Sequence, residues 1–276
     1  MQQPHSNDPF IVPAKKSLGQ HFLTSDIVPG WLCEAADLHP DRPVLEIGPG
    51  TGVLTAVLLE REVSVLAIET DKRSLSVLRE RFASHIHSGQ LQLIDGDVRD
   101  GIPNHPLLCD HSYQVVANIP YYLTGLILRT YLESERQPAK MTLLVQKEVA
   151  ERIARDKKQS ILQVAVHAFG TPEYVRTVRR GHFTPPPRIE SAILTIHHIT
   201  HERVPQTLRN TFFSLVRAGF AHRRKQLLGN IRPVFPANTD LESIFSKHGL
   251  SSQTRAENLT LDDWITLSHT LTTLVE

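Results

Sequence analysis

A chain of 276 residues, 40% apolar and 21% charged, can bury one sizeable core and a smaller second domain. No apolar run approaches the roughly 20 residues that span a bilayer, and residues 1–14 lack the apolar core of a signal peptide. The two cysteines, Cys33 and Cys109, suggest neither a disulfide framework nor a zinc site, and the histidines show no familiar ligand spacing. We therefore expect a cytoplasmic protein that holds no metal.

The net charge of +1 hides an uneven distribution along the chain. Residues 1–175 carry 17 basic and 21 acidic side chains, residues 176–233 carry 11 basic and two acidic ones, and the remainder carries two basic and six acidic ones. Affinity for nucleic acid comes largely from neutralised phosphates, so the basic segment predicts a phosphate-binding face. The alternative is a solvated helix face.

The chain begins with a polar, proline-containing tail, 1–14, that we expect to be disordered. Beyond it, short apolar runs alternate with longer amphipathic ones. The apolar runs predict strands over 44–47, 63–68, 91–94, 115–117 and 141–145. The amphipathic runs predict helices that include 52–61, 72–84 and 123–133. Such alternation predicts a parallel sheet with helices on both faces, which binds ligands outside the carboxyl ends of its strands.

After residue 170 the pattern changes. Two further predicted strands, 174–178 and 191–196, flank the proline-rich segment 183–187 and could close the sheet as an antiparallel pair. The later segments look helical, over 206–217, 222–231, 240–248 and 261–274. We therefore predict a catalytic domain over 15–200 and a small helical domain over 201–276.

Three glycines, Gly48, Gly50 and Gly52, follow the first strand and open a helix, where they let the backbone approach a ligand closely. The dinucleotide fingerprint needs a glycine where this chain has Val53, and the Gly-Lys-Ser/Thr of a phosphate-binding loop is absent. Both phosphate-binding interpretations are weakened.

Acidic residues follow the next two strands. Glu69 can accept hydrogen bonds from ribose hydroxyls, and Asp97 can accept one from an adenine amino group. Carboxylates without a basic phosphate clamp suit an adenosine that carries no phosphate, and a cationic sulfonium tolerates acidic surroundings. The set predicts a site for S-adenosylmethionine.

The residues Asn118, Ile119, Pro120 and Tyr121 follow the fourth strand and place an amide, a carbonyl, a rigid proline and an aromatic ring in succession. Proline fixes φ and offers no N–H, which stiffens the turn. This arrangement predicts a binding site for a flat base with an exocyclic amine. The alternative is an ordinary strand that ends in an Asn-x-Pro turn.

With these motifs, the chain resembles the ribosomal RNA adenine N6,N6-dimethyltransferases, and most closely the bacterial enzymes that act on the 16S RNA of the small subunit. The resemblance covers nearly the whole chain and rests on segments 16–23, 46–52, 69–71, 96–98, 118–122, 146–152, 183–192, 223–225 and 255–259. The resemblance implies a Rossmann-like sheet of the S-adenosylmethionine-dependent methyltransferases with a small all-helical C-terminal domain. It also implies dimethylation of two adjacent adenines near the 3′ end of 16S RNA, in small-subunit biogenesis.

The resemblance also implies which residues bind the cofactor. His21 and Leu23 would lie over it, Gly48 would line its methionine portion, Glu69 would hold the ribose and Asp97 would bind the adenine. The full implied set is His21, Leu23, Gly48, Gly50, Glu69, Asp97, Val98 and Asn118. Two departures stand out, since His21 replaces an asparagine found in many members and segment 154–160 is shorter than usual and basic.

For catalysis we expect Asn118 and the Ile119 carbonyl to accept the two hydrogens of the adenine amine. Tyr121 would stack on an extruded base, with Phe183 on its opposite face, although Phe183 could instead be a core residue before a proline turn. A basic helical region is expected to contact RNA phosphates through Arg217, Arg223, Arg224 and Lys225.

The expected partner is 16S RNA, within the small subunit or its precursor, bound by a monomer. One rival is methylation of a 23S adenine, as in the related resistance methyltransferases. Another is a non-catalytic RNA-binding factor of the same fold, for which loss of Asn118 or the glycine loop would be expected. A small-molecule or protein methyltransferase would have no evident use for the basic segment.

Overall fold

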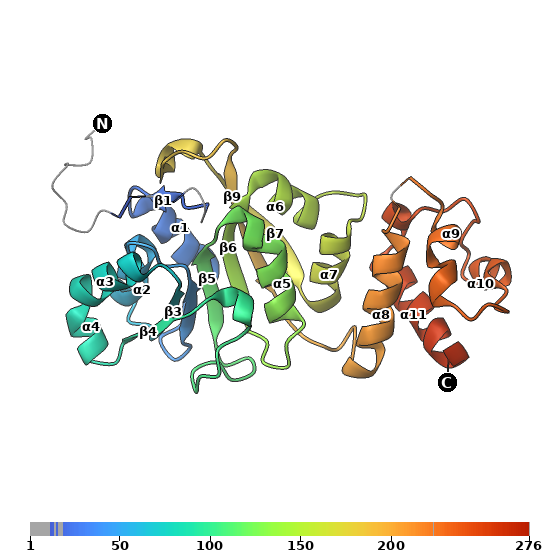
Figure 1. The fold of residues 1–276 in the computed structure, drawn as a ribbon, viewed down its shortest axis with the longest axis horizontal. Helices are drawn as coiled ribbons and strands as arrows, with labels where there is room; N and C mark the ends of the chain where they lie inside the picture. Colours follow the sequence, from blue (N-terminus) through green and yellow to red (C-terminus); the bar gives the residue numbers. More distant parts are fainter. Residues whose placement is uncertain (1–11, 14, 16–18, 223, 276) are drawn as a thin grey trace. The chain divides into compact units, whose positions relative to one another are not determined.

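The computed structural model describes residues 12, 13, 15, 19–222 and 224–275 (Figure 1). Most of the tail that we predict to be disordered, together with residues 16–18 of the motif that begins the resemblance, lies outside the described residues. Within that tail, Val12 is 6% exposed and the carbonyl of Pro13 accepts a hydrogen bond from Arg73. None of the helices described is long and apolar enough to cross a bilayer.

One mixed sheet of seven strands forms the centre of the fold, in the order β4-β3-β2-β5-β6-β9-β7. Its strands are β2 (Val44–Ile47), β3 (Val65–Glu69), β4 (Leu91–Asp95), β5 (Gln114–Asn118), β6 (Lys140–Gln146), β7 (Thr171–Val178) and β9 (Ser191–His197). The first five of these pair in parallel, and β9 runs antiparallel to β6. A separate two-stranded sheet pairs β1 (Phe22–Leu23) with β8 (Phe183–Thr184). The predicted alternation is confirmed, and the two later predicted strands join the sheet as β9, antiparallel to β6, and β7 at the edge.

The helices of this sheet domain are α1 (Ile27–Ala36), α2 (Val53–Glu60), α3 (Lys72–Arg81), α4 (Ala83–His87) and α5 (Thr124–Leu132), and α6 (Lys147–Ala154) begins in it. Helix α1 is not among the helices predicted by range, and its sequence contains Pro29 and Gly30. Pro29 lies in the first turn of the helix, where a missing N–H leaves no intrahelical hydrogen bond unmade.

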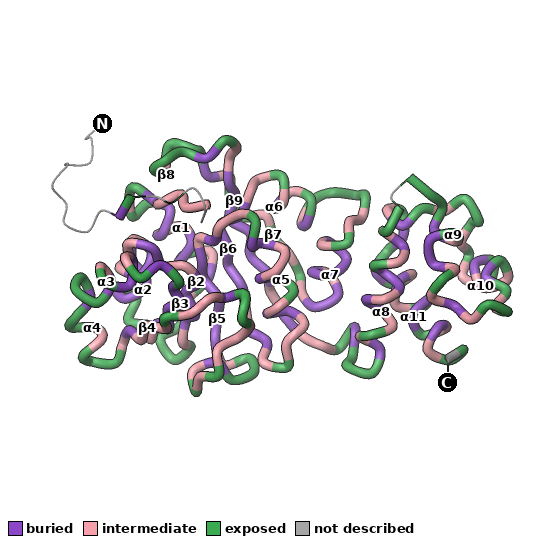
Figure 2. The backbone as a smooth tube through the Cα atoms, viewed as in Figure 1, coloured by how far each residue is buried: buried purple, intermediate pink, exposed green. Residues whose placement is uncertain are grey.

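The central strands form the core. Every residue of β2 and of β3 is buried, because strands of a parallel sheet are covered on both faces and are therefore rich in Val, Ile and Leu. Figure 2 shows these strands as a continuous buried region, whereas the segment around β8 is largely exposed.

The chain divides into two compact units. The first contains residues up to 150 together with 172–199, and the second contains 151–171 together with 200–276. The structure thus adds 151–171 to the helical unit, although the predicted boundary is a single one at residue 200. The helices of the second unit are α7 (Ile161–Phe169), α8 (Gln206–Gly219), α9 (Leu227–Ile231), α10 (Leu241–Lys247) and α11 (Leu261–Val275).

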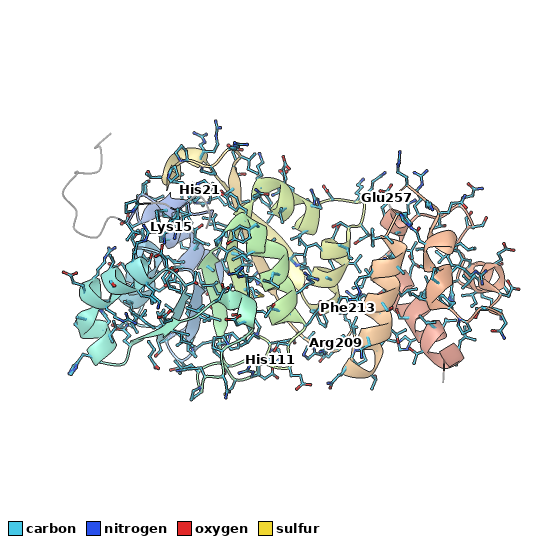
Figure 3. The ribbon with its side chains drawn as sticks, viewed as in Figure 1. Lys15, His21, His111, Arg209, Phe213 and Glu257 are labelled. Carbon is cyan, nitrogen blue, oxygen red and sulfur yellow. The ribbon has the colours of Figure 1, made fainter. Side chains whose placement is uncertain are left out.

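The core of the second unit is aromatic. Phe169, Phe212 and Trp264 are almost fully buried. The guanidinium of Arg209 lies 5.6 Å from the ring centre of Phe169, and the ring of Phe213 lies 5.9 Å from the same ring (Figure 3). These contacts join α7 to α8, so the helix that precedes β7 packs as part of the helical unit.

Candidate active site

The site lies next to β2, where the order in which the chain adds strands to the sheet reverses. The chain runs outward from β2 through β3 and β4, then returns to β5 on the other side of β2. In an open α/β sheet this switch point leaves a crevice at the carboxyl ends of the strands. A pocket occurs at this edge, and its wall contains segments 19–23, 46–51, 68–70, 96–99 and 118–123.

The loop after β2 needs its glycines for two reasons. Gly48, Gly50 and Gly52 have φ values of 68°, 59° and 85°, a backbone region that residues with a side chain rarely adopt. In addition, a Cβ at Gly50 would lie 2.9 Å from a ring carbon of Phe22. The loop can therefore approach both the ligand and the β1 segment, and it forms one wall of the pocket.

Glu69 ends β3 and ties it to this loop. Its Oε2 accepts a hydrogen bond from Gly50 N at 3.0 Å, and its Oε1 accepts bonds from the N–H groups of Thr70 at 2.9 Å and Asp71 at 2.8 Å. Burial raises the pKa of Glu69, and these N–H groups act in the opposite direction. A carboxylate has about four acceptor positions, so Glu69 can still bind a ribose hydroxyl.

Glu46 is a pocket residue that the sequence analysis placed only in the loop motif. It is fully buried, its Oε2 accepts a hydrogen bond from Thr55 Oγ1 at 2.7 Å, and its Oε1 has no partner among the described residues. Burial raises its pKa to about 8. An unsatisfied buried oxygen in the pocket wall suits a cationic or hydrogen-bond-donating ligand group. Its place directly before the glycine loop is the signal that could have identified it.

Asp97 follows β4 and precedes a short 3-10 helix, Val98–Asp100. Its carboxylate accepts hydrogen bonds from Arg99 N at 2.9 Å and from Arg99 Nε at 2.8 Å, and this side chain lowers the pKa of Asp97. Arg99 also lines the pocket, which the sequence analysis did not predict. An adenine amine bound at Asp97, as predicted, would share the carboxylate with Arg99.

Asn118 is the last residue of β5, and the backbone of His21, just before β1, orients its side-chain amide. Its Nδ2 donates a hydrogen bond to the carbonyl of His21 at 3.3 Å. Because a carbonyl only accepts, the NH₂ group must face it, and Oδ1 is left as an acceptor on the other side of the amide. This is the orientation that a bound amine requires.

Tyr121 is held from two sides. Its hydroxyl lies 2.6 Å from Ser191 Oγ, and burial raises its pKa. The ring centre of His21 lies 5.9 Å from that of Tyr121, with 25° between the planes. Nδ1 of His21 lies 2.8 Å from the carbonyl of Pro185 and must therefore carry the proton of the ring. His21, next to β1, thus contacts both Tyr121 in the turn after β5 and Pro185 in the segment after β8.

Phe183 lies apart from the other expected catalytic residues. It is 3% exposed, pairs with Leu23 across the two-stranded sheet and belongs to the core of the first unit, outside the pocket wall. This is the position that the alternative interpretation, a core residue before a proline turn, predicts.

The pocket wall otherwise unites all the expected cofactor-binding and catalytic residues. The residues that share it are His21, Leu23, Gly48, Gly50, Glu69, Asp97, Val98, Asn118, Ile119, Pro120 and Tyr121. They come from the β1 segment and from four successive strand ends, so they are distant in sequence and close in space. Their individual roles stay predictions.

The expected RNA-binding residues lie in the second unit. Arg217 is exposed on the last turn of α8, and Arg224 and Lys225 are exposed in the turn before α9. The predicted helix over 222–231 is wrong in its first half, because α9 begins only at Leu227 and Arg223 lies outside the described residues. The basic region is therefore largely a turn.

The side chain of Asn230 holds this turn against the end of α8. The buried Asn230 donates Nδ2 hydrogen bonds to the carbonyls of Gly219 at 2.7 Å and His222 at 3.1 Å. Gly219 lets Trp264 approach, since a Cβ there would lie 2.4 Å from the indole ring. The turn is thus anchored to α8, and α8 packs closely on α11 at Gly219.

Comparison with known proteins decides the family. Residues 12–273 match the ribosomal RNA adenine dimethylase family. The chain belongs to this family. It is 38% identical to a ribosomal RNA small subunit methyltransferase A from Dehalococcoides mccartyi (strain CBDB1), over 92% of this chain and 87% of the relative. It is 37% identical to the protein of that name from Thermosynechococcus vestitus, over 95% and 98%.

Solved structures agree with this assignment. The 23S rRNA methyltransferase ErmE is 26% identical, covers 91% of this chain and 99% of its own, and superposes with a TM-score of 0.69. A dimethyladenosine transferase from Plasmodium falciparum is 23% identical, with 92% and 98% coverage and a TM-score of 0.77, which supports the fold alone. Family membership confirms the predicted fold class, the enzyme class and S-adenosylmethionine as the cofactor.

Proposed function

We propose that this member of the ribosomal RNA adenine dimethylase family dimethylates the N6 atoms of two adjacent adenines near the 3′ end of 16S RNA. It would act as a cytoplasmic monomer on the small subunit or its precursor. The names of the relatives at 37–38% identity support the small subunit as the target. The observation that carries the chemistry is the Asn118 amide, whose Oδ1 is left to accept while Nδ2 is held by His21.

The pocket fits S-adenosylmethionine, because the unpartnered Oε1 of Glu46 and the carboxylates of Glu69 and Asp97 favour a cationic adenosine that carries no phosphate. When bound, the cofactor supplies a methyl group on a positively charged sulfur, which keeps the electron pair of the broken bond. Asn118 Oδ1 and the Ile119 carbonyl would accept the two N6 hydrogens and draw them out of the ring plane. The nitrogen lone pair then points at the methyl carbon.

Most of the acceleration comes from this placement, since holding two reactants in line replaces a bimolecular encounter. As N6 bonds to carbon it becomes acidic, so its proton passes to water without a strong base. The second transfer repeats these steps on the monomethylated amine, which leaves one hydrogen to be accepted and needs room for one methyl beside Asn118.

Tyr121 would stack on the adenine, which must leave its helix to enter the pocket. Its ring is fixed by the Ser191 hydrogen bond and by His21. A stacking role for Phe183 requires that β8 moves, because the ring is buried against the core in this structure.

The test is methyl transfer from labelled donor to under-methylated small subunits, followed by mapping of the labelled bases. We expect two dimethylated adenines near the 3′ end of 16S RNA. Asn118→Ala should lower the rate of methyl transfer about 100-fold or more. Asn104→Ala, at an exposed asparagine outside the pocket wall, is the matched control. Label on 23S RNA, no label on RNA, or an unchanged rate for Asn118→Ala would contradict the proposal.

A further inference from the structure

A group of three arginines in the first unit has no place in the function described so far. The segment between β7 and β9 carries Arg179, Arg180 and Arg188, which we name the arginine arm. All three side chains are exposed, and within the part of the chain that the structure describes none forms an ion pair. Arg180 Nη1 donates to the Arg188 carbonyl at 3.3 Å, which ties the two ends of the arm together.

The neighbouring charges leave the arm positive. Glu190, the one acidic residue between β7 and β9, pairs with Lys147 Nζ at 3.1 Å. Arg176 is excluded from the arm, because its guanidinium lies 4.4 Å from the ring centre of Trp31. The positive charge of the arm is therefore uncompensated and faces solvent.

The arm is attached to the pocket wall on both sides. Thr24 N donates to the His182 carbonyl at 3.0 Å, β1 pairs with β8, and His21 bonds to the Pro185 carbonyl. At the other end, Ser191 pairs with Gln146 at the carboxyl end of β6 and holds the Tyr121 hydroxyl. The segment thus runs along the edge of the sheet that carries the pocket, next to the segment of β1 (Figure 1).

We propose that the arginine arm binds the phosphates of the RNA strand next to the methylated adenine. The proposal rests on the proposed function, since it names how the RNA is held at that site. A phosphodiester that entered the buried pocket would lose its water, and the Arg99 guanidinium there is already paired with Asp97, whereas the exposed guanidinium groups of the arm can bind phosphate oxygens through paired hydrogen bonds. The charge pattern would therefore leave the phosphates at the rim while the base enters the pocket.

The test compares Arg179→Gln/Arg180→Gln/Arg188→Gln with the wild-type protein in steady-state methylation of under-methylated small subunits. We expect the KM for RNA to rise about tenfold, and the slope of log KM against log salt to fall by about 2, since each neutralised phosphate contributes about 0.7–0.9. The kcat at saturating RNA and the affinity for S-adenosylmethionine should stay unchanged. A triple Arg→Lys variant should keep most of the salt slope, because it keeps the charge.

The matched control is Arg42→Gln/Arg61→Gln/Arg79→Gln. All three arginines are exposed and outside the pocket wall, Arg42 and Arg61 shortly before β2 and β3 and Arg79 on α3, and their replacement changes the net charge by the same amount. An arm variant that matches this control in KM and salt slope would overturn the proposal. So would a variant whose kcat or cofactor affinity falls while its salt slope is unchanged, because the arm would then only shape the pocket. If instead the wild-type protein labels no RNA, the proposed function itself fails.

Discussion

The carboxylates of the pocket and the arginines of the arm are held in opposite ways. Glu46 and Glu69 are buried and accept hydrogen bonds from groups fixed by the fold, whereas Arg179 and Arg188 are exposed and pair with no carboxylate that the structure describes. A small ligand binds well when its partners are ordered before it arrives. A polyanion is bound by solvated charges whose counterions it releases. The two regions therefore call for different experiments. A substitution in the pocket should lower cofactor affinity by the same factor at every salt concentration, whereas a substitution in the arm should change the salt dependence of RNA binding.

The largest effect is expected for Glu69→Ala. The change removes the charged acceptor for the ribose, worth about 1.5–3 kcal/mol for one hydrogen bond, and frees the N–H of Gly50 that orders the glycine loop. Affinity for S-adenosylmethionine, measured by calorimetry, should fall about 100-fold at every salt concentration. Glu80→Ala, at an exposed residue of α3, should leave it unchanged. If the loss of cofactor affinity disappeared at low salt, the pocket would respond to salt as the arm is expected to, and the comparison would be wrong.

Glu46→Gln tests the pocket through pH. The folded carboxyl keeps its proton up to about pH 8, whereas the unfolded one releases it near 4.5. The contribution of this group to the free energy of unfolding should therefore be largest below pH 4.5 and fall as pH rises towards 8, by up to about 1.4 kcal/mol per unit. The variant should flatten this fall in denaturant titrations between pH 5 and 7. An identical slope in the two proteins would show that Glu46 is ionised when folded.

Gly219→Ala tests how the second unit holds its basic turn. A Cβ there would meet the Trp264 ring at 2.4 Å, so we expect the free energy of unfolding to fall by about 1–3 kcal/mol. Gly229→Ala is the control, because nothing lies within 4 Å of its added Cβ and it sits in α9. That change should be neutral or stabilising by about 0.4–1 kcal/mol. Equal effects of the two changes in thermal unfolding would contradict the close packing of α8 on α11.

The smallest effect is expected for Arg217→Gln/Arg224→Gln/Lys225→Gln in the second unit. Affinity for RNA should fall about tenfold at moderate salt, with a binding slope lower by about 2, because the side chains are exposed and contact only phosphates. Binding to small-subunit RNA at several salt concentrations measures both quantities. If affinity and slope match those of the Arg42/Arg61/Arg79 control, this turn does not bind RNA.

Much of the fold could be predicted because its signals are local. The apolar runs of β2 and β3 and the glycines after β2 reflect burial and backbone conformation, which act at single positions. The first half of the helix over 222–231 was predicted wrongly, since the turn that replaces it is held by Asn230, whose partners Gly219 and His222 lie on the preceding helix and turn. Helix α1 contains Pro29 and Gly30, which usually argue against a helix, but proline is tolerated in the first turn, where Pro29 lies.

The sequence by itself determined the family, the cofactor class and the residues of the pocket, because strand ends of a parallel sheet converge at one edge whatever the loops between them do. Only the tertiary structure showed how those residues are arranged. It oriented the Asn118 amide through the His21 carbonyl, left one oxygen of Glu46 unpartnered, placed Arg99 on Asp97 and buried Phe183 in the core. The first and the last of these depend on contacts between residues far apart in the chain, whereas the pairing of Arg99 with Asp97 is local and depends on side-chain geometry that the sequence does not show.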